Sequence, residues 1–131
     1  MRKVPTGYSV STELVVRYAE TDQMGVVYYG NYFTWFEVGR NAFFQSLGRS
    51  YKVLEEQGLI LPIVEAFCHY QAPAKYEDRV IITTQLMGVS GSRINFSYVI
   101  QRGDTLIATG RTMQASVSKS SGRPVNLKKH F

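Results

Sequence analysis

One stretch decides the fold of this chain: residues 31–47, which read NYFTWFEVGRNAFFQSL. On a helix drawn through these residues, apolar and aromatic side chains cover most of the circumference. The polar remainder is a narrow stripe made of Thr34, Glu37, Asn41 and Gln45. A helix that is apolar on nearly all sides must be enclosed by other structure. The stretch therefore predicts one long helix around which the rest of the chain is folded.

Most of the remaining sequence predicts β-strands. Alternating apolar and polar side chains, bounded by turn residues, mark five segments as strands: residues 12–18, 60–71, 79–87, 93–102 and 105–118. The turns at residues 88–91 and at Gly103-Asp104 suit hairpins, and hairpins join antiparallel strands. A short second helix is expected between Ser50 and Gln57. The fold class that follows is α+β, an antiparallel five-stranded sheet wrapped around one long helix.

With 131 residues, the chain has the length of one compact domain, covering residues 1–131, and we expect residues 1–8 and 120–131 to be mobile ends. Its 44% hydrophobic and 19% charged residues are typical of soluble globular proteins. No apolar run is long enough to span a membrane, and residues 1–8 lack the core of a signal peptide. These features predict a cytoplasmic location.

The third strand has apolar side chains on both faces. Alternation places Val80, Ile82 and Leu86 on one face, and Ile81 and Met87 on the other. One helix covers only one face of a sheet, so we expect subunits to pair.

A loop with one carboxylate joins the first strand to the helix. Asp22 lies on this loop, which Gly25 and Gly30 mark as irregular, about two turns before the body of the helix. The loop can therefore point a carboxylate toward the first free N–H groups of the helix. Helix N-termini attract negative charge and supply unpaired donors, which an acyl-transfer site needs beside its reacting carbonyl.

The same loop carries a specific resemblance. Residues 22–32, DQMGVVYYGNY, are followed by Trp35-Phe36-Glu37 and Arg40, and later by residues 64–70 and the turn 72–78, APAKYED. Together these motifs resemble the 4-hydroxybenzoyl-CoA thioesterase family, and within it the small bacterial acyl-CoA thioesterases found with the Tol-Pal genes. The resemblance extends over nearly the whole chain, from about residue 13 to residue 117.

This resemblance implies a hotdog fold, in which two subunits join their sheets edge to edge and share active sites at the interface. It also implies homodimers that pair into a homotetramer. The activity implied is hydrolysis of acyl-CoA to a free carboxylic acid and CoA. No metal or redox cofactor belongs to that activity, since coenzyme A is part of the substrate.

By resemblance, Asp22 is the catalytic residue and the backbone N–H of Tyr29 is the main donor to the thioester oxygen. Gly25 and Val26 shape the loop against the substrate. Whether Asp22 activates water or attacks the acyl carbon itself stays open, because a helix N-terminus lowers the basicity of a carboxylate while desolvation by an acyl chain raises it. Water activation is the slightly favoured hypothesis for aliphatic substrates.

Two further groups are candidates for substrate binding. Aromatic side chains beside the loop are expected to contribute one or two residues to the acyl cavity: Tyr28, Tyr32, Phe33 and Phe36. Cations on or after the late strands are candidates for holding the CoA phosphates: Arg93, Lys119 and Arg123.

Other interpretations compete with these assignments. Asp22 taken alone fits a structural turn or cap, and Glu37 is a rival acid that could instead pair with Arg40 one helical turn later. His69 and His130 fit packed or solvated side chains better than a catalytic base.

Two alternative functions also remain. A hotdog dehydratase or hydratase acting on acyl thioesters needs a His beside a carboxylate, and the loop and helix contain no His. A β-rich RNA-binding module needs aromatic side chains on an exposed strand face, whereas the aromatic residues here concentrate in the helix.

Overall fold

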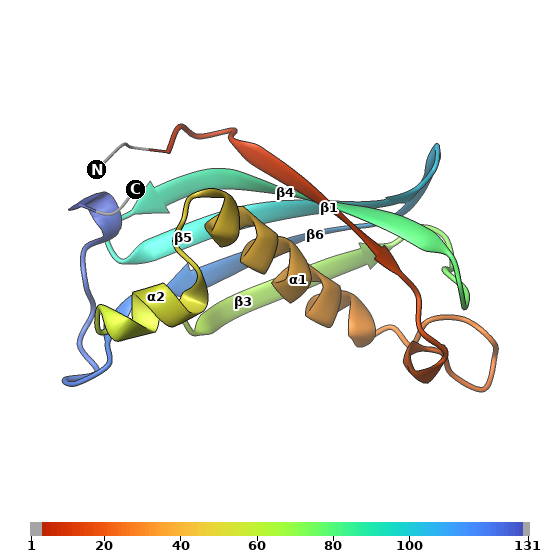
Figure 1. The fold of residues 1–131 in the computed structure, drawn as a ribbon, viewed down its shortest axis with the longest axis horizontal. Helices are drawn as coiled ribbons and strands as arrows, with labels where there is room; N and C mark the ends of the chain where they lie inside the picture. Colours follow the sequence, from red (N-terminus) through yellow and green to blue (C-terminus); the bar gives the residue numbers. More distant parts are fainter. Residues whose placement is uncertain (1–3, 130–131) are drawn as a thin grey trace.

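The computed structural model describes residues 4–129. Along the chain, the elements are β1 (Ser9–Val15), the 3-10 turn η1 (Tyr18–Glu20), α1 (Asn31–Ser46), α2 (Tyr51–Glu56), β2 (Leu59–Ile60), β3 (Ile63–Tyr70), β4 (Arg79–Ser90), β5 (Arg93–Arg102), β6 (Thr105–Ala115), β7 (Val117–Ser118) and η2 (Leu127–Lys129). Five strands form one antiparallel sheet in the order β1-β4-β5-β6-β3, while β2 pairs with β7. Helix α1 lies across one face of this sheet (Figure 1). The predicted α+β arrangement is confirmed.

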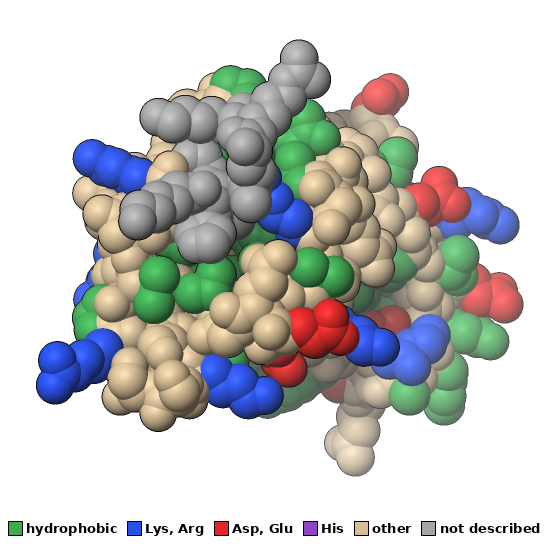
Figure 2. Space-filling model, turned by 60° about the vertical axis from the view of Figure 1, so that its left-hand side comes forward, with side chains coloured by type: hydrophobic (Ala, Val, Ile, Leu, Met, Phe, Trp, Pro, Cys, Tyr) green, Lys and Arg blue, Asp and Glu red, His purple; other side chains and the backbone are tan. Residues whose placement is uncertain are grey.

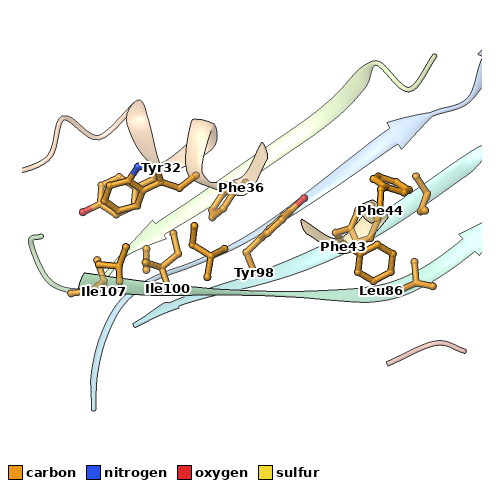
Figure 3. Packing of buried hydrophobic residues seen from close by; sticks show 14 of the residues in the cluster. Tyr32, Phe36, Phe43, Phe44, Leu86, Tyr98, Ile100 and Ile107 are labelled. Atoms are coloured by element: carbon orange, nitrogen blue, oxygen red, sulfur yellow. The ribbon is translucent and has the colours of Figure 1, made fainter. Parts of the chain in front are cut away.

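Helix α1 ends within one residue of its predicted end. Its aromatic side chains Tyr32, Trp35, Phe36, Phe43 and Phe44 are buried. Figure 3 shows that four of these rings, those of Tyr32, Phe36, Phe43 and Phe44, lie opposite side chains of the sheet, among them Leu86, Tyr98, Ile100 and Ile107. The expected enclosure on all sides is wrong for a single chain. One sheet covers only one side of the helix, and the predicted polar stripe faces solvent at Thr34, Glu37 and Gln45.

Two glycines allow α1 to approach the sheet closely. A Cβ atom at Gly110 on β6 would collide with the ring of Phe36, and one at Gly39 on α1 would collide with the side chains of Thr84 and Ile82. The helix axis can lie this near the strands only because neither position carries a side chain.

The two-faced character of β4 is as predicted. Val80, Ile82 and Leu86 are buried beneath α1, while Ile81 and Met87 are 41% and 51% exposed on the outer face. The outer face of the sheet is therefore uncovered in the single chain.

Strand boundaries near the loop differ from the prediction. The first strand was expected at residues 12–18, yet β1 ends at Val15. The Val16 N–H donates to Asp78 O, and the chain then turns through η1, so Tyr18 lies outside the sheet. The expected strand 60–71 is divided at Leu61-Pro62 into β2 and β3.

Later boundaries differ for similar reasons. The third strand continues to Ser90, because the register shifts between Leu86 and Gly88 and Gly88 then pairs with Asn95 instead of beginning the turn. The expected strand 105–118 breaks at Ser116, after which β7 pairs with β2. The short helix α2 is confirmed, and the Ser50 hydroxyl caps it by accepting from the Val53 N–H at 3.4 Å.

Both ends that were predicted to be mobile make contacts where they are described. The Gly7 N–H donates to Leu86 O, and the Leu127 N–H donates to Gly91 O while its side chain is buried. Mobility of these ends stays a prediction, and residues 1–3 and 130–131, including His130, lie outside the described part. Within residues 4–129, no helix is both long and apolar enough to cross a membrane.

Candidate active site at the start of α1

The loop before α1 is a small hairpin. At its base the Tyr28 N–H donates to Glu20 O at 2.9 Å, and farther out the Asp22 N–H donates to Val26 O at 2.8 Å. The tip is closed by the Gly25 N–H, which donates to Asp22 O at 3.0 Å. Gly25 has a φ of +79°, a conformation that favours glycine. The hairpin therefore fixes the backbone of Asp22 relative to the residues that lead into the helix.

The Asp22 carboxylate is held by one oxygen only. Its Oδ1 atom accepts from the Met24 N–H at 2.8 Å, which is the turn geometry typical of aspartate. Of the residues that the structure describes, none donates to Oδ2. The side chain is half-buried. One oxygen is thus anchored in the turn, and the other is free to meet a water molecule or a substrate.

The N–H of Tyr29 is a fixed donor without an acceptor among residues 4–129. Its peptide plane is held from the other side, because the Tyr28 carbonyl accepts from the Asn31 N–H at 2.9 Å. The next peptide is held as well, since the Tyr29 carbonyl accepts from the Tyr70 hydroxyl at 2.9 Å. A donor that needs no reorientation is what stabilisation of a developing oxyanion requires.

Asp22 and Tyr29 line the same pocket, which has a volume of about 330 Å³. Its lining residues come from the loop, the start of α1, and the end of β3 with the segment that follows it. These segments meet at one end of the molecule (Figure 1). The other lining residues are Met24, Val26, Val27, Tyr32, Tyr70, Gln71, Ala72 and Pro73. The pocket is thus mainly apolar, and its lining includes one acidic residue, Asp22, as expected for a site that binds an acyl group.

The structure brings together most of the residues predicted near the loop. Val26 and Tyr32 line the pocket with the two catalytic candidates, and Gly25 forms the adjacent turn. Tyr28 does not line it: its ring is exposed and packs against the ring of Tyr29, with centroids 4.5 Å apart. The roles of these residues stay predictions.

Arg93 and Lys119 lie at the opposite end of the sheet from the pocket. Tyr70 pairs with Ala108 of β6 and Arg93 pairs with Ala115. Those seven residues of strand correspond to about 23 Å. Lys119 follows β7 at the same far end, where its N–H donates to Gly58 O. A single chain therefore does not bring these cations to Asp22.

Figure 2 looks toward this far end of the molecule. Among the described residues drawn on that face, Lys and Arg side chains are spread apart, some of them beside acidic ones, and form no single patch. The net charge of +5 is thus not concentrated here into a surface of the kind that nucleic acid binds.

The proposed ion pair between Glu37 and Arg40 is wrong. Arg40 is 6% exposed and turns into the core, where it donates to Tyr51 Oη at 3.1 Å and to Tyr98 Oη at 3.2 Å. Burial alone would lower its pKa, yet Tyr98 and Tyr51 outweigh that effect and raise it. Glu37 is exposed and lines a separate hollow of about 260 Å³, not the pocket of Asp22.

His69 does not lie in the pocket either. It is exposed on β3, and its Nδ1 atom lies 2.7 Å from Nε2 of Gln71. Neither rival acid nor rival base from the sequence is therefore placed beside the free N–H of Tyr29.

Sequence reasoning did not assign a role to Tyr70 or Glu20. The Tyr70 hydroxyl donates to the Tyr29 carbonyl, and partial burial together with Cys68 raises the pKa of Tyr70 to about 12. Tyr70 is distant in sequence from the loop, and only the pairing of β3 with β6 brings it there. Glu20 lies beside the motif, and its carboxylate accepts from the indole N–H of Trp35, a contact that the sequence does not reveal.

The sequence model of the thioesterase-like superfamily matches residues 16–131, which include the loop, α1 and every strand after them. The chain belongs to the thioesterase-like superfamily. The predicted enzyme class, a thioester hydrolase, and the predicted hotdog fold are thereby confirmed. The narrower resemblance to 4-hydroxybenzoyl-CoA thioesterases stays a prediction.

Individual relatives agree with this family. YneP of Bacillus subtilis is 35% identical over 120 residues, which cover 91% of this chain and 87% of YneP. The acyl-CoA thioesterase YbgC of Haemophilus influenzae is 29% identical over 111 residues, covering 84% of this chain and 82% of YbgC. The crystal structure of the DHNA-CoA thioesterase of Staphylococcus aureus superposes with a TM-score of 0.88 at 36% identity, covering 94% of this chain and 83% of that one.

Proposed function

We propose that this chain is an acyl-CoA thioesterase that uses Asp22 and the backbone N–H of Tyr29. The observation that carries the proposal is that Asp22 and Tyr29 line the same mainly apolar pocket. Within residues 4–129, Asp22 has one carboxylate oxygen without a donor, and the fixed N–H of Tyr29 has no acceptor. The names of the relatives YbgC and the Staphylococcus aureus enzyme support coenzyme A thioesters as the substrate class.

In the proposed reaction, the thioester oxygen accepts from the Tyr29 N–H while the acyl chain lies against the aromatic rings of Tyr32 and Tyr70. Water attacks the carbonyl carbon and gives a proton to Asp22. The tetrahedral intermediate then breaks its C–S bond, and the CoA thiolate leaves and takes up a proton. Loss of a donor such as Tyr29 N–H typically costs on the order of 100- to 1000-fold in rate.

Nucleophilic attack by Asp22 is the alternative route. It would form a mixed anhydride, which water then cleaves to the same products. The free Oδ2 atom suits both routes, and we slightly favour water activation for aliphatic acyl groups.

The proposed enzyme is a homodimer that joins β3 of one chain to β3 of a second. β3 is an edge strand, and it exposes Ile63, Val64, Phe67 and Tyr70, each by more than 40%. An exposed apolar edge of this length invites pairing with another strand. The other edge, β1, instead exposes mainly Ser and Glu side chains.

An antiparallel β3–β3 contact would also bring Arg93 and Lys119 of the second chain closer to the pocket of the first. It would place the beginning of β3 of the second chain beside the Tyr70 end of the first, so the far end of one chain approaches the pocket of the other. These cations could then hold the CoA phosphates across the interface. Pairing of two dimers through the uncovered outer sheet face, and a cytoplasmic location, belong to the same proposal.

A thiol-release assay over a panel of acyl-CoAs tests this function. The panel should hold short, medium and long aliphatic chains and aromatic acyl groups, each also presented on an acyl carrier protein. We expect release of CoA with an equal amount of free acid for at least one acyl-CoA. Absence of thiol release from every thioester would refute the proposal.

A further inference from the structure

Resting on the proposed thioesterase function, we propose that Glu20 is a positioning residue: its carboxylate and carbonyl form a clamp that sets the distance between Asp22 and the Tyr29 N–H. Glu20 is 6% exposed, does not line the pocket and has no part in the reaction described above.

The Glu20 side chain joins the loop to the helix. Its Oε2 atom accepts from the indole Nε1–H of Trp35 at 2.7 Å, and its Oε1 atom accepts from the Arg17 N–H at 2.9 Å. The Arg17 Nε atom lies 3.6 Å from Oε1. Trp35 belongs to the first turns of α1, so the buried carboxylate connects the segment before the loop to the body of the helix.

The Glu20 carbonyl forms the second half of the clamp. It accepts from the Tyr28 N–H at 2.9 Å and from the Asn31 side-chain amide at 2.8 Å. The Tyr28 bond is the base of the hairpin. Asp22 lies two residues from this base toward the tip of the hairpin, and Tyr29 lies one residue outside the base, toward α1.

In this geometry, a short path of covalent bonds and one hydrogen bond connects Asp22 to the Tyr29 N–H. The Glu20–Tyr28 bond is the shortest connection between Asp22 and Tyr29. The loop between them adds the Asp22–Val26 bond, the bonds at its tip and the bond from the Val27 N–H to Ala74 O. Because each polar atom of the clamp has a partner, the carboxylate is stable in the interior. A change in its charge or length would leave the indole or the Arg17 N–H without an acceptor and loosen the base of the hairpin.

The test compares variants of the clamp with a destabilised control. Glu20→Gln places an amide NH₂ opposite one of the two donors, Asn31→Ala removes one bond to the carbonyl, and Trp35→Phe removes the indole donor. Ser50→Ala deletes the cap of α2, remote from the pocket, and serves as the control for stability alone. All four are assayed with the best acyl-CoA, with rates expressed per folded enzyme.

We expect Glu20→Gln to lower kcat on the order of 100-fold, as for a reacting group misplaced by about 1 Å, with little change in KM. Asn31→Ala should lower kcat less, and it reports on the clamp even if the Glu20 variant does not fold. The double variant Glu20→Gln, Trp35→Phe should lose no more than the worse single variant, because both break one interaction. Unchanged kcat in these variants, or losses equal to that of Ser50→Ala, would overturn the inference.

A second readout separates this inference from the proposed function. Trp35 is the single tryptophan of the chain, so its indole N–H gives one assignable signal in a nitrogen–proton NMR spectrum. We expect slow exchange with solvent in the wild type and a shifted, faster-exchanging signal in Glu20→Gln. A wild type that hydrolyses no thioester but shows this protected signal refutes the function alone. Fast exchange in the wild type refutes the clamp.

Discussion

The phenolic hydroxyl of Tyr70 donates a hydrogen bond to the carbonyl oxygen of Tyr29, at 2.9 Å. The bond connects the last residue of edge strand β3 to the residue whose N–H we propose as the oxyanion donor. The edge through which we propose that two chains pair is therefore also in contact with the proposed active site. Pairing and catalysis should respond together to changes in β3.

Replacing Tyr70 by Phe tests this connection. Tyr70→Phe keeps the ring that packs at 5.1 Å against Tyr32 but removes the donor to Tyr29. We expect kcat/KM for acyl-CoA to fall about 2- to 10-fold, the equivalent of one neutral hydrogen bond. Tyr76→Phe, at an exposed tyrosine outside the pocket, is the matched control and should leave the kinetics unchanged. Equal kinetics for the two variants would contradict the supporting role of Tyr70.

Tyr70 should also make stability depend on alkaline pH. Its pKa is raised from 10.0 to about 12 by partial burial and by Cys68, so the folded protein holds this proton more tightly than the unfolded chain. The stabilising contribution is complete below pH 10 and is lost as the pH rises through about 12. Chemical unfolding at about pH 8 and about pH 11 should therefore show a larger loss of stability for the wild type than for Tyr70→Phe. Equal losses would argue against the raised pKa.

A charged side chain introduced on β3 should disrupt the proposed β3–β3 pairing of two chains. Val64 is 47% exposed on β3, and a lysine there should repel a second β3 strand. We expect Val64→Lys to sediment as a monomer and to lose activity, because the second chain would supply the cations for CoA. Val15→Lys, at a similarly exposed position on the other edge strand, is the control and should remain a dimer. If Val64→Lys still forms dimers, the interface does not lie at β3.

Because α1 packs closely against the sheet, alanine should destabilise the protein at Gly110 but not at Gly88. Gly110→Ala would force the ring of Phe36 away from β6 and should destabilise the fold by about 1–3 kcal/mol. Gly88→Ala adds the same methyl group where no other atom lies within 4 Å, and should change stability little. Denaturant unfolding of both variants provides the comparison, and equal stabilities would contradict the close approach.

The sequence predicted the long helix, the strand-rich remainder and the position of Asp22. The helix α1 was predictable because its long apolar stretch is interrupted only by a narrow polar stripe at helical spacing. Strand ends were less predictable, because they depend on partners that are distant in sequence. Val16, for example, bonds to Asp78, and Ser116 separates two strands that pair with different neighbours.

The site was predicted only in part. Asp22, Val26, Tyr29 and Tyr32 come together because they are close in sequence to the start of the helix. Tyr70 reaches the same pocket through the register of β3, which no local pattern encodes. The distance of Arg93 and Lys119 from the pocket also follows from strand register, and their predicted role now depends on a second chain.

The most direct test of the account compares Asp22→Asn with Glu37→Gln in single-turnover hydrolysis of the best acyl-CoA substrate. The two changes are chemically matched, since each turns one acid of the loop–helix region into its amide. We expect Asp22→Asn to lower the rate by at least about 100-fold while Glu37→Gln keeps nearly the wild-type rate. Full activity in Asp22→Asn, with loss of activity in Glu37→Gln, would contradict the account and move the chemistry to the helix.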